Sequence, residues 1–310
     1  MRETPTPPDE FGEDRIPVPR WLSFFLPSSP AQFFRSLIRL VVFFLSTWAA
    51  WWFLAKLITP LVDMLVASAV SLALAVVATT TIMMRIYELR PFYMVGFFWN
   101  RAAGAHLGAG LALGAGSSLL VVAVQWAGGW ARFERMAPIP DAGATFTFGF
   151  VILVVGAAGE ELLFRGYGFQ HLICAFGPWF SILFTSALFA LAHTANPAFS
   201  RLSMMNTGLF GLVFGYAYWR TRDLWLPLGM HFAWNFSLAT IGATVSGLKI
   251  KLTAVSVVSA GSRLWSGGDY GPEASLVTSI TLLATLVFLW KRPPARQEQG
   301  ILASQYGGRG

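Results

Sequence analysis

The chain has 310 residues, of which 55% are hydrophobic and only 12% are charged. Soluble domains carry about 25% charged residues, so this composition excludes an ordinary soluble fold. The net charge of +7 could indicate nucleic-acid binding, but the basic residues lie mainly at the ends of apolar segments and no nucleic-acid partner is expected. The single cysteine, Cys174, excludes a disulfide framework and is predicted to be buried.

The predicted elements follow a membrane pattern along the chain. Residues 1–30 are polar and rich in proline, and they predict a disordered tail. A bilayer core is crossed by about 20 apolar residues in a helix. On that scale the sequence predicts an all-α, polytopic membrane helix bundle of about eight transmembrane helices, at about 37–58, 61–84, 105–127, 145–175, 178–195, 203–220, 224–245 and 274–290.

Three segments differ from simple crossings. Residues 92–103 combine aromatic residues with Arg101 and predict a short interfacial helix. The fourth span, 145–175, is too long for one crossing and is expected to bend or to continue past the membrane. Residues 291–310 predict a polar C-terminal tail, which leaves 31–290 as one membrane domain with its motif core at 145–245.

The distribution of Lys and Arg predicts the orientation. With eight spans both termini lie on one side, and the positive-inside rule places that side in the cytoplasm. The chain is therefore expected to be a multi-pass integral membrane protein, in the plasma membrane if the source is bacterial. GxxxG pairs predict close helix packing, either within the bundle or at a dimer face, and they are formed by Gly104 with Gly108, Gly110 with Gly114, and Gly211 with Gly215.

The fourth span carries two carboxylates, Glu160 and Glu161, after an unbroken apolar run. A charge at the bilayer centre costs at least about 2.5–3.5 kcal/mol, so such residues are usually paired, protonated or functional. Glu161 and Arg165 are four residues apart and can form an ion pair on one helix face. Glu160 points about 100° away, and an apolar site beside a second carboxylate makes it a candidate general base. A buried Glu–Arg clamp with a second Glu at the membrane surface is the structural alternative.

Two further spans carry polar groups in apolar surroundings. His193 ends the fifth span, one turn after Phe189, and a packing role is the alternative reading for a lone membrane histidine. His231 and Asn235 lie one turn apart on the seventh span and project together. They can act as interhelical hydrogen bonds or can donate together to one oxygen, as an oxyanion hole requires. Of the other histidines, His106 is predicted to be structural and His171 to lie at the surface beyond the membrane.

These residues form an ordered set: Glu160-Glu161-x-x-x-Arg165, then Phe189-x-x-x-His193, then His231-x-x-x-Asn235. The set resembles the motifs of the CPBP intramembrane protease family, which includes the Rce1-type CAAX prenyl endopeptidases and the bacterial Abi proteins. The resemblance covers about 145–245, and no motif residue is missing.

The resemblance implies an intramembrane endopeptidase in which Glu160 activates water and Glu161 supports it with Arg165. His193 would assist at the water or the substrate carbonyl, and His231 and Asn235 would stabilise the oxyanion. It also leaves a zinc-dependent mechanism open, with Glu160, His193 and His231 as ligands. Arg165 would compete for the carboxylates, so a mechanism without a cofactor is favoured over zinc.

The substrate is expected to be a membrane-associated peptide or protein, and a prenylated one is among the options. A non-catalytic membrane scaffold or immunity protein would carry the same residues without cleaving anything. A proton-coupled transporter could also use buried Glu, Arg and His residues, although the two halves of the chain show no evident repeat.

Overall fold

The computed structural model describes residues 30–292, 294–298 and 300–302. The predicted disordered tail, 1–30, therefore lies outside the described residues except for Pro30. The described part is mostly helical, as the sequence predicts. Four helices are long and apolar enough to cross a membrane, namely α2 (Pro30–Ile58), α3 (Met64–Met83) with its extension η1 (Met84–Glu88), α4 (Arg101–Ala127), and α5 (Ala142–Arg165) with α6 (Tyr167–Phe176). Four such helices make this a multi-pass membrane protein.

The remaining helices are shorter or less apolar. α7 (Pro178–Ala192) and α11 (Leu276–Lys291) are apolar but have fewer residues than a full crossing requires. α8 (Arg201–Thr221) and α9 (Trp225–Thr240) occupy the sixth and seventh predicted spans. A helix therefore lies at each predicted span, while the number of membrane crossings, about eight, remains a prediction.

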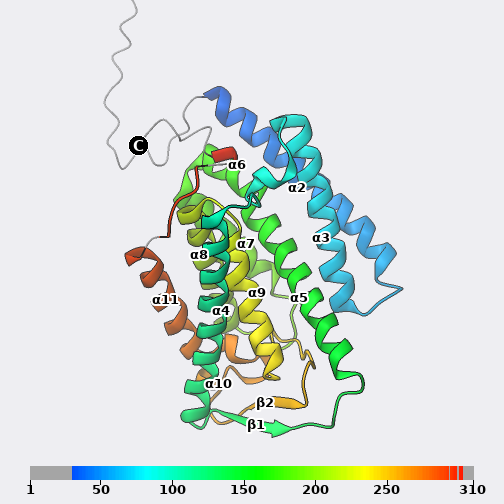
Figure 1. Cartoon of the computed structure of the whole chain (residues 1–310), viewed down its shortest axis with the longest axis vertical. Helices are drawn as coiled ribbons and strands as arrows, with labels where there is room; N and C mark the ends of the chain where they lie inside the picture. Colours follow the sequence, from blue (N-terminus) through cyan, green and yellow to red (C-terminus); the bar gives the residue numbers. More distant parts are fainter. Residues whose placement is uncertain (1–29, 293, 299, 303–310) are drawn as a thin grey trace, which may run out of the picture.

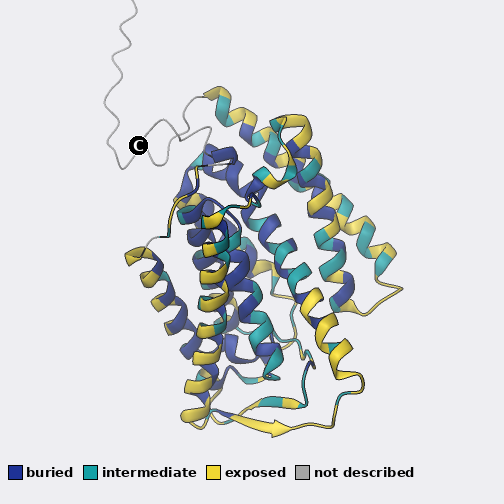
Figure 2. Cartoon of the chain, viewed as in Figure 1, coloured by how far each residue is buried: buried dark blue, intermediate teal, exposed yellow. Residues whose placement is uncertain are grey.

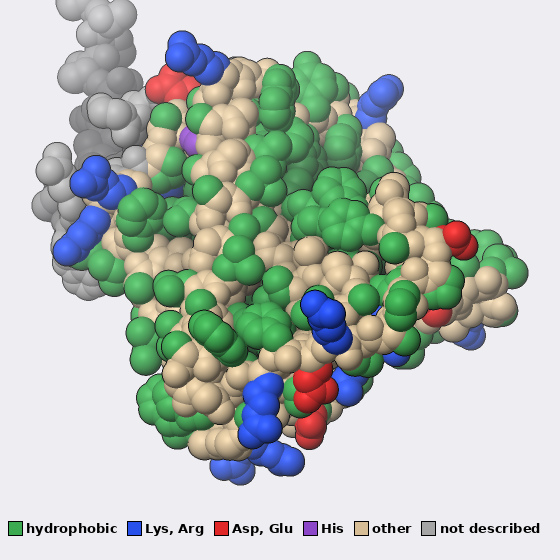
Figure 3. Space-filling view, turned by 60° about the horizontal axis from the view of Figure 1, so that its bottom comes forward, with side chains coloured by type: hydrophobic (Ala, Val, Ile, Leu, Met, Phe, Trp, Pro, Cys, Tyr) green, Lys and Arg blue, Asp and Glu red, His purple; other side chains and the backbone are tan. Residues whose placement is uncertain are grey.

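The helices form two groups on either side of α5 (Figure 1). α2 and α3 pack against each other, and α3 packs on α5. On the other side α4 packs on α9, α7 on α8, and α11 on α8 and α4. Burial is highest where these elements meet, and the outer faces of α2 and of the first half of α5 are exposed (Figure 2). Figure 3, in which the end with β1 and β2 comes forward, shows hydrophobic side chains over much of the visible surface and charged side chains in small groups. This surface is suited to lipid, because apolar side chains need not be hidden there.

The fourth predicted span bends, as its length implies. α5 ends at Arg165, and α6 begins at Tyr167 after Gly166. A side chain at position 166 would lie 2.2 Å from the Leu162 carbonyl oxygen, so only glycine fits this bend. The bend places the last turn of α5 inside the bundle.

Two of the three GxxxG pairs lie at helix contacts within the chain. A Cβ atom at Gly110 would meet the Leu226 carbonyl oxygen at 2.4 Å, and one at Gly114 would meet that of Met230 at 2.2 Å. The pair on α4 therefore fixes the close approach of α9. Gly211 likewise touches Ser186 of α7. Small residues at these positions bring backbones together in the way that membrane bundles require.

The predicted interfacial helix, 92–103, is wrong as a single element. A 3-10 turn, η2 (Phe92–Val95), stops at Gly96, whose φ of 130° leaves the helical region. α4 then begins at Arg101, where the Asn100 side chain accepts a hydrogen bond from the Ala103 N–H. A glycine turn and an asparagine N-cap thus divide the segment.

Strands at one end of the bundle were not predicted. β1 (Ala131–Arg135) pairs antiparallel with β2 (Val255–Ser259), with Phe133 opposite Val257. The long segment after α9 also holds three short elements: α10 (Arg263–Ser266), η3 (Gly268–Tyr270) and η4 (Pro272–Ala274). This segment covers the end of the bundle where α7 and α9 finish (Figure 1).

Part of the predicted polar tail, 291–310, packs onto the bundle. The Gln297 N–H donates to the Thr221 carbonyl at 2.8 Å, and its side chain exchanges hydrogen bonds with Asn100. Ile301 and Leu302 are buried. These contacts hold the segment after α11 against the end of α8 and the start of α4.

Candidate active site

The last turns of α5 bring both carboxylates into the bundle. Glu161 and Arg165 are completely buried, whereas the Glu160 side chain is 28% exposed. Adjacent residues on a helix differ by about 100° in direction, so one carboxylate points into the packed interior while the other stays partly exposed.

Glu161 is held by two partners through one oxygen. Its Oε1 lies 3.1 Å from Arg165 Nη1 and 2.8 Å from His231 Nδ1. Arg165 also donates to the Gly211 carbonyl on α8 at 3.2 Å. These bonds join α5, α8 and α9 around a single buried ion pair. The ion pair predicted between Glu161 and Arg165 is confirmed.

Glu160 faces two imidazoles. Its Oε2 lies 3.9 Å from His193 Nε2 and 3.8 Å from His231 Nε2. These separations are too long for hydrogen bonds. The Oε2 atom is buried and has no hydrogen-bond partner among the described residues. Glu160 therefore faces His193 of the α7 end and His231 of α9. Its Oε2 makes no hydrogen bond, and the Nε2 atoms of both histidines point toward it.

The other ring nitrogen of each histidine fixes its orientation. His193 Nδ1 is 2.8 Å from the Phe189 carbonyl one turn earlier on α7. A carbonyl can only accept, so Nδ1 carries a proton and Nε2 is the nitrogen free to act on a substrate. His231 has the same arrangement, with Glu161 taking the place of the carbonyl.

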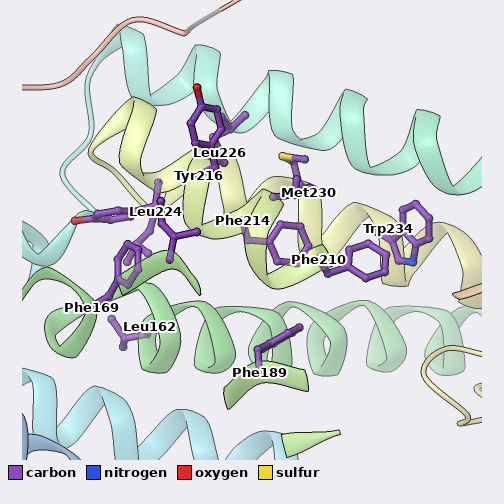
Figure 4. Close-up of a cluster of buried hydrophobic side chains, with 14 of the residues drawn as sticks. Leu162, Phe169, Phe189, Phe210, Phe214, Tyr216, Leu224, Leu226, Met230 and Trp234 are labelled. Atoms are coloured by element: carbon purple, nitrogen blue, oxygen red, sulfur yellow. The ribbon is translucent and has the colours of Figure 1, made fainter. Parts of the chain in front are cut away.

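Aromatic rings enclose these polar groups. Phe214 stacks on His231 with ring centroids 5.2 Å apart, and Phe189 lies 4.6 Å from His193. The Arg165 guanidinium carbon lies 4.8 Å from the centre of the Phe189 ring. Figure 4 shows Phe214 in the apolar cluster together with Phe210, Met230 and Trp234. Phe214 and the Gly211 carbonyl were missed from the sequence, where the only signal was the close-packing pair of Gly211 and Gly215.

Asn235 lies one turn after His231 on α9 and is partly buried. Its side chain makes no hydrogen bond within the part of the chain that the structure describes. The geometry therefore brings Glu160, Glu161, Arg165, His193 and His231 together, and it leaves the role of Asn235 as a prediction.

Two other histidines have defined partners. His106 is buried and lies 2.6 Å from Asp223, which agrees with its predicted structural role. The prediction that His171 lies at the surface is wrong. It is completely buried, and its Nε2 is 3.2 Å from Glu88 at the end of η1. α6 turns back into the bundle after Gly166, so His171 remains inside although it follows a full span.

The residue types at Glu160, His193 and His231 fit a zinc ion in part. Histidines that bind zinc usually donate their second N–H to a carboxylate or a carbonyl, as these two do. Among residues 30–292, 294–298 and 300–302, however, no three His, Cys, Asp or Glu side chains are grouped closely enough to hold a metal ion. The hydrogen bonds made by the two Nδ1 atoms are therefore those expected of zinc-binding histidines. The atoms that would bind the ion are not close enough together to form a metal site.

Comparison with known families agrees with this geometry. The family model of the type II CAAX prenyl endopeptidases, described as Rce1-like, matches residues 142–237. The chain is similar to the Rce1-like family over this segment. The segment runs from the start of α5 to within the last turn of α9, and it contains all six predicted site residues. The proteins that this model describes are endopeptidases. No curated protein matches the chain.

Proposed function

We propose that the chain is an intramembrane endopeptidase that hydrolyses peptide bonds of membrane-associated substrates, with Glu160 as the general base. One observation supports this most directly: an unpaired Glu160 oxygen lies within 4 Å of the Nε2 atoms of His193 and His231. Separations of 3.8 and 3.9 Å are beyond direct hydrogen bonding, and a water can bridge polar groups that are this far apart. A water held there would have a base and two imidazoles within reach.

The proposed reaction follows from these positions. Glu160 takes a proton from the water, and the resulting hydroxide attacks the scissile carbonyl carbon. The negative charge on the carbonyl oxygen is stabilised by the Nε2–H of His193 or His231 in its doubly protonated form, with Asn235 as a further donor. The proton on Glu160 then passes to the departing amine, which balances the reaction and restores the base. Glu161 and Arg165 do not touch the substrate in this scheme. They position His231 through its Nδ1 atom.

We infer that the substrate is prenylated or otherwise anchored in the membrane. The family description names CAAX prenyl endopeptidases, and the site lies on membrane helices lined with aromatic residues. Both termini are proposed to lie in the cytoplasm, which would place the site within reach of proteins anchored to that face.

Zinc is the second candidate mechanism. It is favoured by one observation, namely that both histidines use Nδ1 for a second contact and direct Nε2 toward Glu160. Glu160, His193 and His231 would hold the ion, which would act as a Lewis acid at the carbonyl. Metal analysis of active protein, before and after chelation, separates the two mechanisms. Full activity in protein without zinc would exclude this candidate.

The function is tested with purified protein in lipid vesicles and a farnesylated peptide, beside the same peptide without the farnesyl group. We expect cleavage of the farnesylated peptide, and a rate about 100-fold to 10,000-fold lower for Glu160→Ala. Glu134→Ala on the exposed face of β1 is the matched control and should cleave at the wild-type rate. Equal rates for Glu160→Ala and wild type would contradict the assignment. Equal cleavage of the two peptides would contradict the proposed prenyl preference.

A further inference from the structure

A groove separate from the proposed active site opens between α7, α8 and α11. Its volume is about 500 Å³, within the range of about 300–1,000 Å³ that ligand sites usually have. Aliphatic side chains from all three helices line one part of it, including Val287, which is 47% exposed. None of the lining residues is acidic. The groove could therefore hold an apolar chain.

One end of the groove has a different character. Trp179 near the start of α7, Trp219 near the end of α8 and Trp290 near the end of α11 all line it. Trp179 also stacks on Tyr216, with ring centroids 6.0 Å apart. Tryptophan and tyrosine gather at the level of lipid headgroups, because their rings are apolar and carry one polar atom. The aromatic end of the groove thus marks the boundary between hydrocarbon and headgroups.

Positive charge lies at this aromatic end. Arg220 is the charged residue among those lining the groove, and its guanidinium carbon lies 6.0 Å from the Tyr216 ring centre. Arg296 lies 5.5 Å from the Trp219 ring centre. Partial burial and the nearby Arg220 hold the pKa of Arg296 below its usual value, and Glu298 offsets part of this effect. Two guanidinium groups that repel each other favour an anion between them.

We propose that this groove binds one anionic phospholipid, with its phosphate at Arg220 and Arg296 and an acyl chain along the apolar part. The arrangement of side chains along the groove supports this ligand, because arginine and aromatic rings lie at one end and aliphatic side chains line the rest. A zwitterionic lipid would fill the same apolar part, but its own cation would oppose the two arginines. A soluble anion would use the arginines and leave the apolar part without a role.

The test is native mass spectrometry of the full chain, released from detergent micelles with added dioleoyl phosphatidylglycerol or dioleoyl phosphatidylcholine. Each arginine near a membrane surface contributes about fivefold in affinity for an anionic lipid. We therefore expect tighter binding of phosphatidylglycerol, and about a fivefold loss for Arg220→Gln. Arg201→Gln, at the exposed opposite end of α8, is the matched control and should bind as the wild type does.

A second variant tests the acyl chain. Val287→Trp fills the groove from the exposed face of α11 and should weaken binding of both lipids. Ile280→Trp changes an exposed residue of the same helix that does not line the groove, and it should leave binding unchanged. Equal affinities for the two lipids, or unchanged binding by Arg220→Gln, would overturn the proposal. Displacement of phosphatidylglycerol by millimolar inorganic phosphate would also overturn it, since the site would then be one for a free anion. The assay needs no proteolysis, so its result is independent of the proposed function.

Discussion

Two clusters in this molecule, one at the proposed site and one only partly buried, use the same residue types in different ways. One joins Glu161 to Arg165 and His231, with Glu160 beside it. The other joins Glu88 to Arg39, His171 and Tyr167 between α2, η1 and α6. Each contains a carboxylate, an arginine and a histidine in an apolar protein. Residue type alone therefore does not distinguish a candidate active site from a structural cluster.

The difference lies in what is left unpaired. Glu88 Oε1 accepts from Arg39 at 3.0 Å, from His171 at 3.2 Å and from Tyr167 at 2.9 Å. None of the buried side-chain atoms of these residues lacks a partner within the described chain. At the other cluster Glu161 is fixed through Oε1, although its Oε2 and Arg165 Nε have no partner among the described residues, and an oxygen of Glu160 stays unpaired beside two imidazole nitrogens. A paired cluster stabilises the fold, whereas an unpaired group that is also partly exposed, as Glu160 is, can act on a substrate.

The largest expected effect on stability comes from breaking the buried ion pair at the proposed site. Arg165→Met leaves Glu161 charged and completely buried, which should lower the free energy of unfolding by about 3–5 kcal/mol. Denaturant unfolding in detergent measures the change. The double variant Arg165→Met, Glu161→Gln removes both charges and should recover part of the loss. A loss below about 1 kcal/mol in the single variant would show that the pair does not hold the site together.

A smaller loss of stability is expected at the structural cluster. Glu88→Gln weakens three hydrogen bonds to one oxygen and should lower the free energy of unfolding by about 1.5–3 kcal/mol. The folded variant should keep its cleavage rate within about twofold of wild type. Thermal unfolding and cleavage assays on the same sample measure both quantities. A large fall in rate with unchanged stability would reverse the roles assigned to the two clusters.

The smallest effect concerns another buried carboxylate, Glu273, in η4 outside the membrane helices. It accepts hydrogen bonds from the Trp234 side chain and the Ser246 N–H, both uncharged donors. Burial raises the pKa of Glu273 above its usual 4.5, although these hydrogen bonds oppose the shift. The folded state then keeps a proton that the unfolded chain has lost, so stability falls as pH rises from 4.5 through the folded pKa.

This sign can be measured against Glu273→Gln, which has a similar shape and does not titrate. Thermal unfolding of both proteins should show the wild type losing stability relative to the variant as pH rises through that window. A wild type that gains stability relative to Glu273→Gln with rising pH would mean that the hydrogen bonds outweigh burial.

The sequence predicts the helices well, because long apolar runs in a membrane protein leave few alternatives. The pairing of Glu161 with Arg165 is also predictable, since it depends only on a spacing of four residues. The hydrogen bond between Glu161 and His231 could not be predicted from the sequence. The two residues are 70 positions apart, and they meet only because α5 packs on α9. From the sequence alone, Glu88 would be taken for a charged residue in a loop. The fold of α6 brings His171 next to it. β1 could not be predicted from the sequence. Four of its five residues are exposed, so it lacks the alternating pattern of a half-buried strand.

The proposed role of Glu160 is tested by comparing Glu160→Gln with Glu88→Gln in single-turnover cleavage of a farnesylated peptide, at equal amounts of folded protein. Both variants remove one negative charge from a carboxylate near a histidine. We expect a rate about 100-fold or more below wild type for Glu160→Gln, with little change in its unfolding temperature. We expect a nearly normal rate for Glu88→Gln. Similar rates for the two variants would contradict the claim that the unpaired carboxylate performs the chemistry.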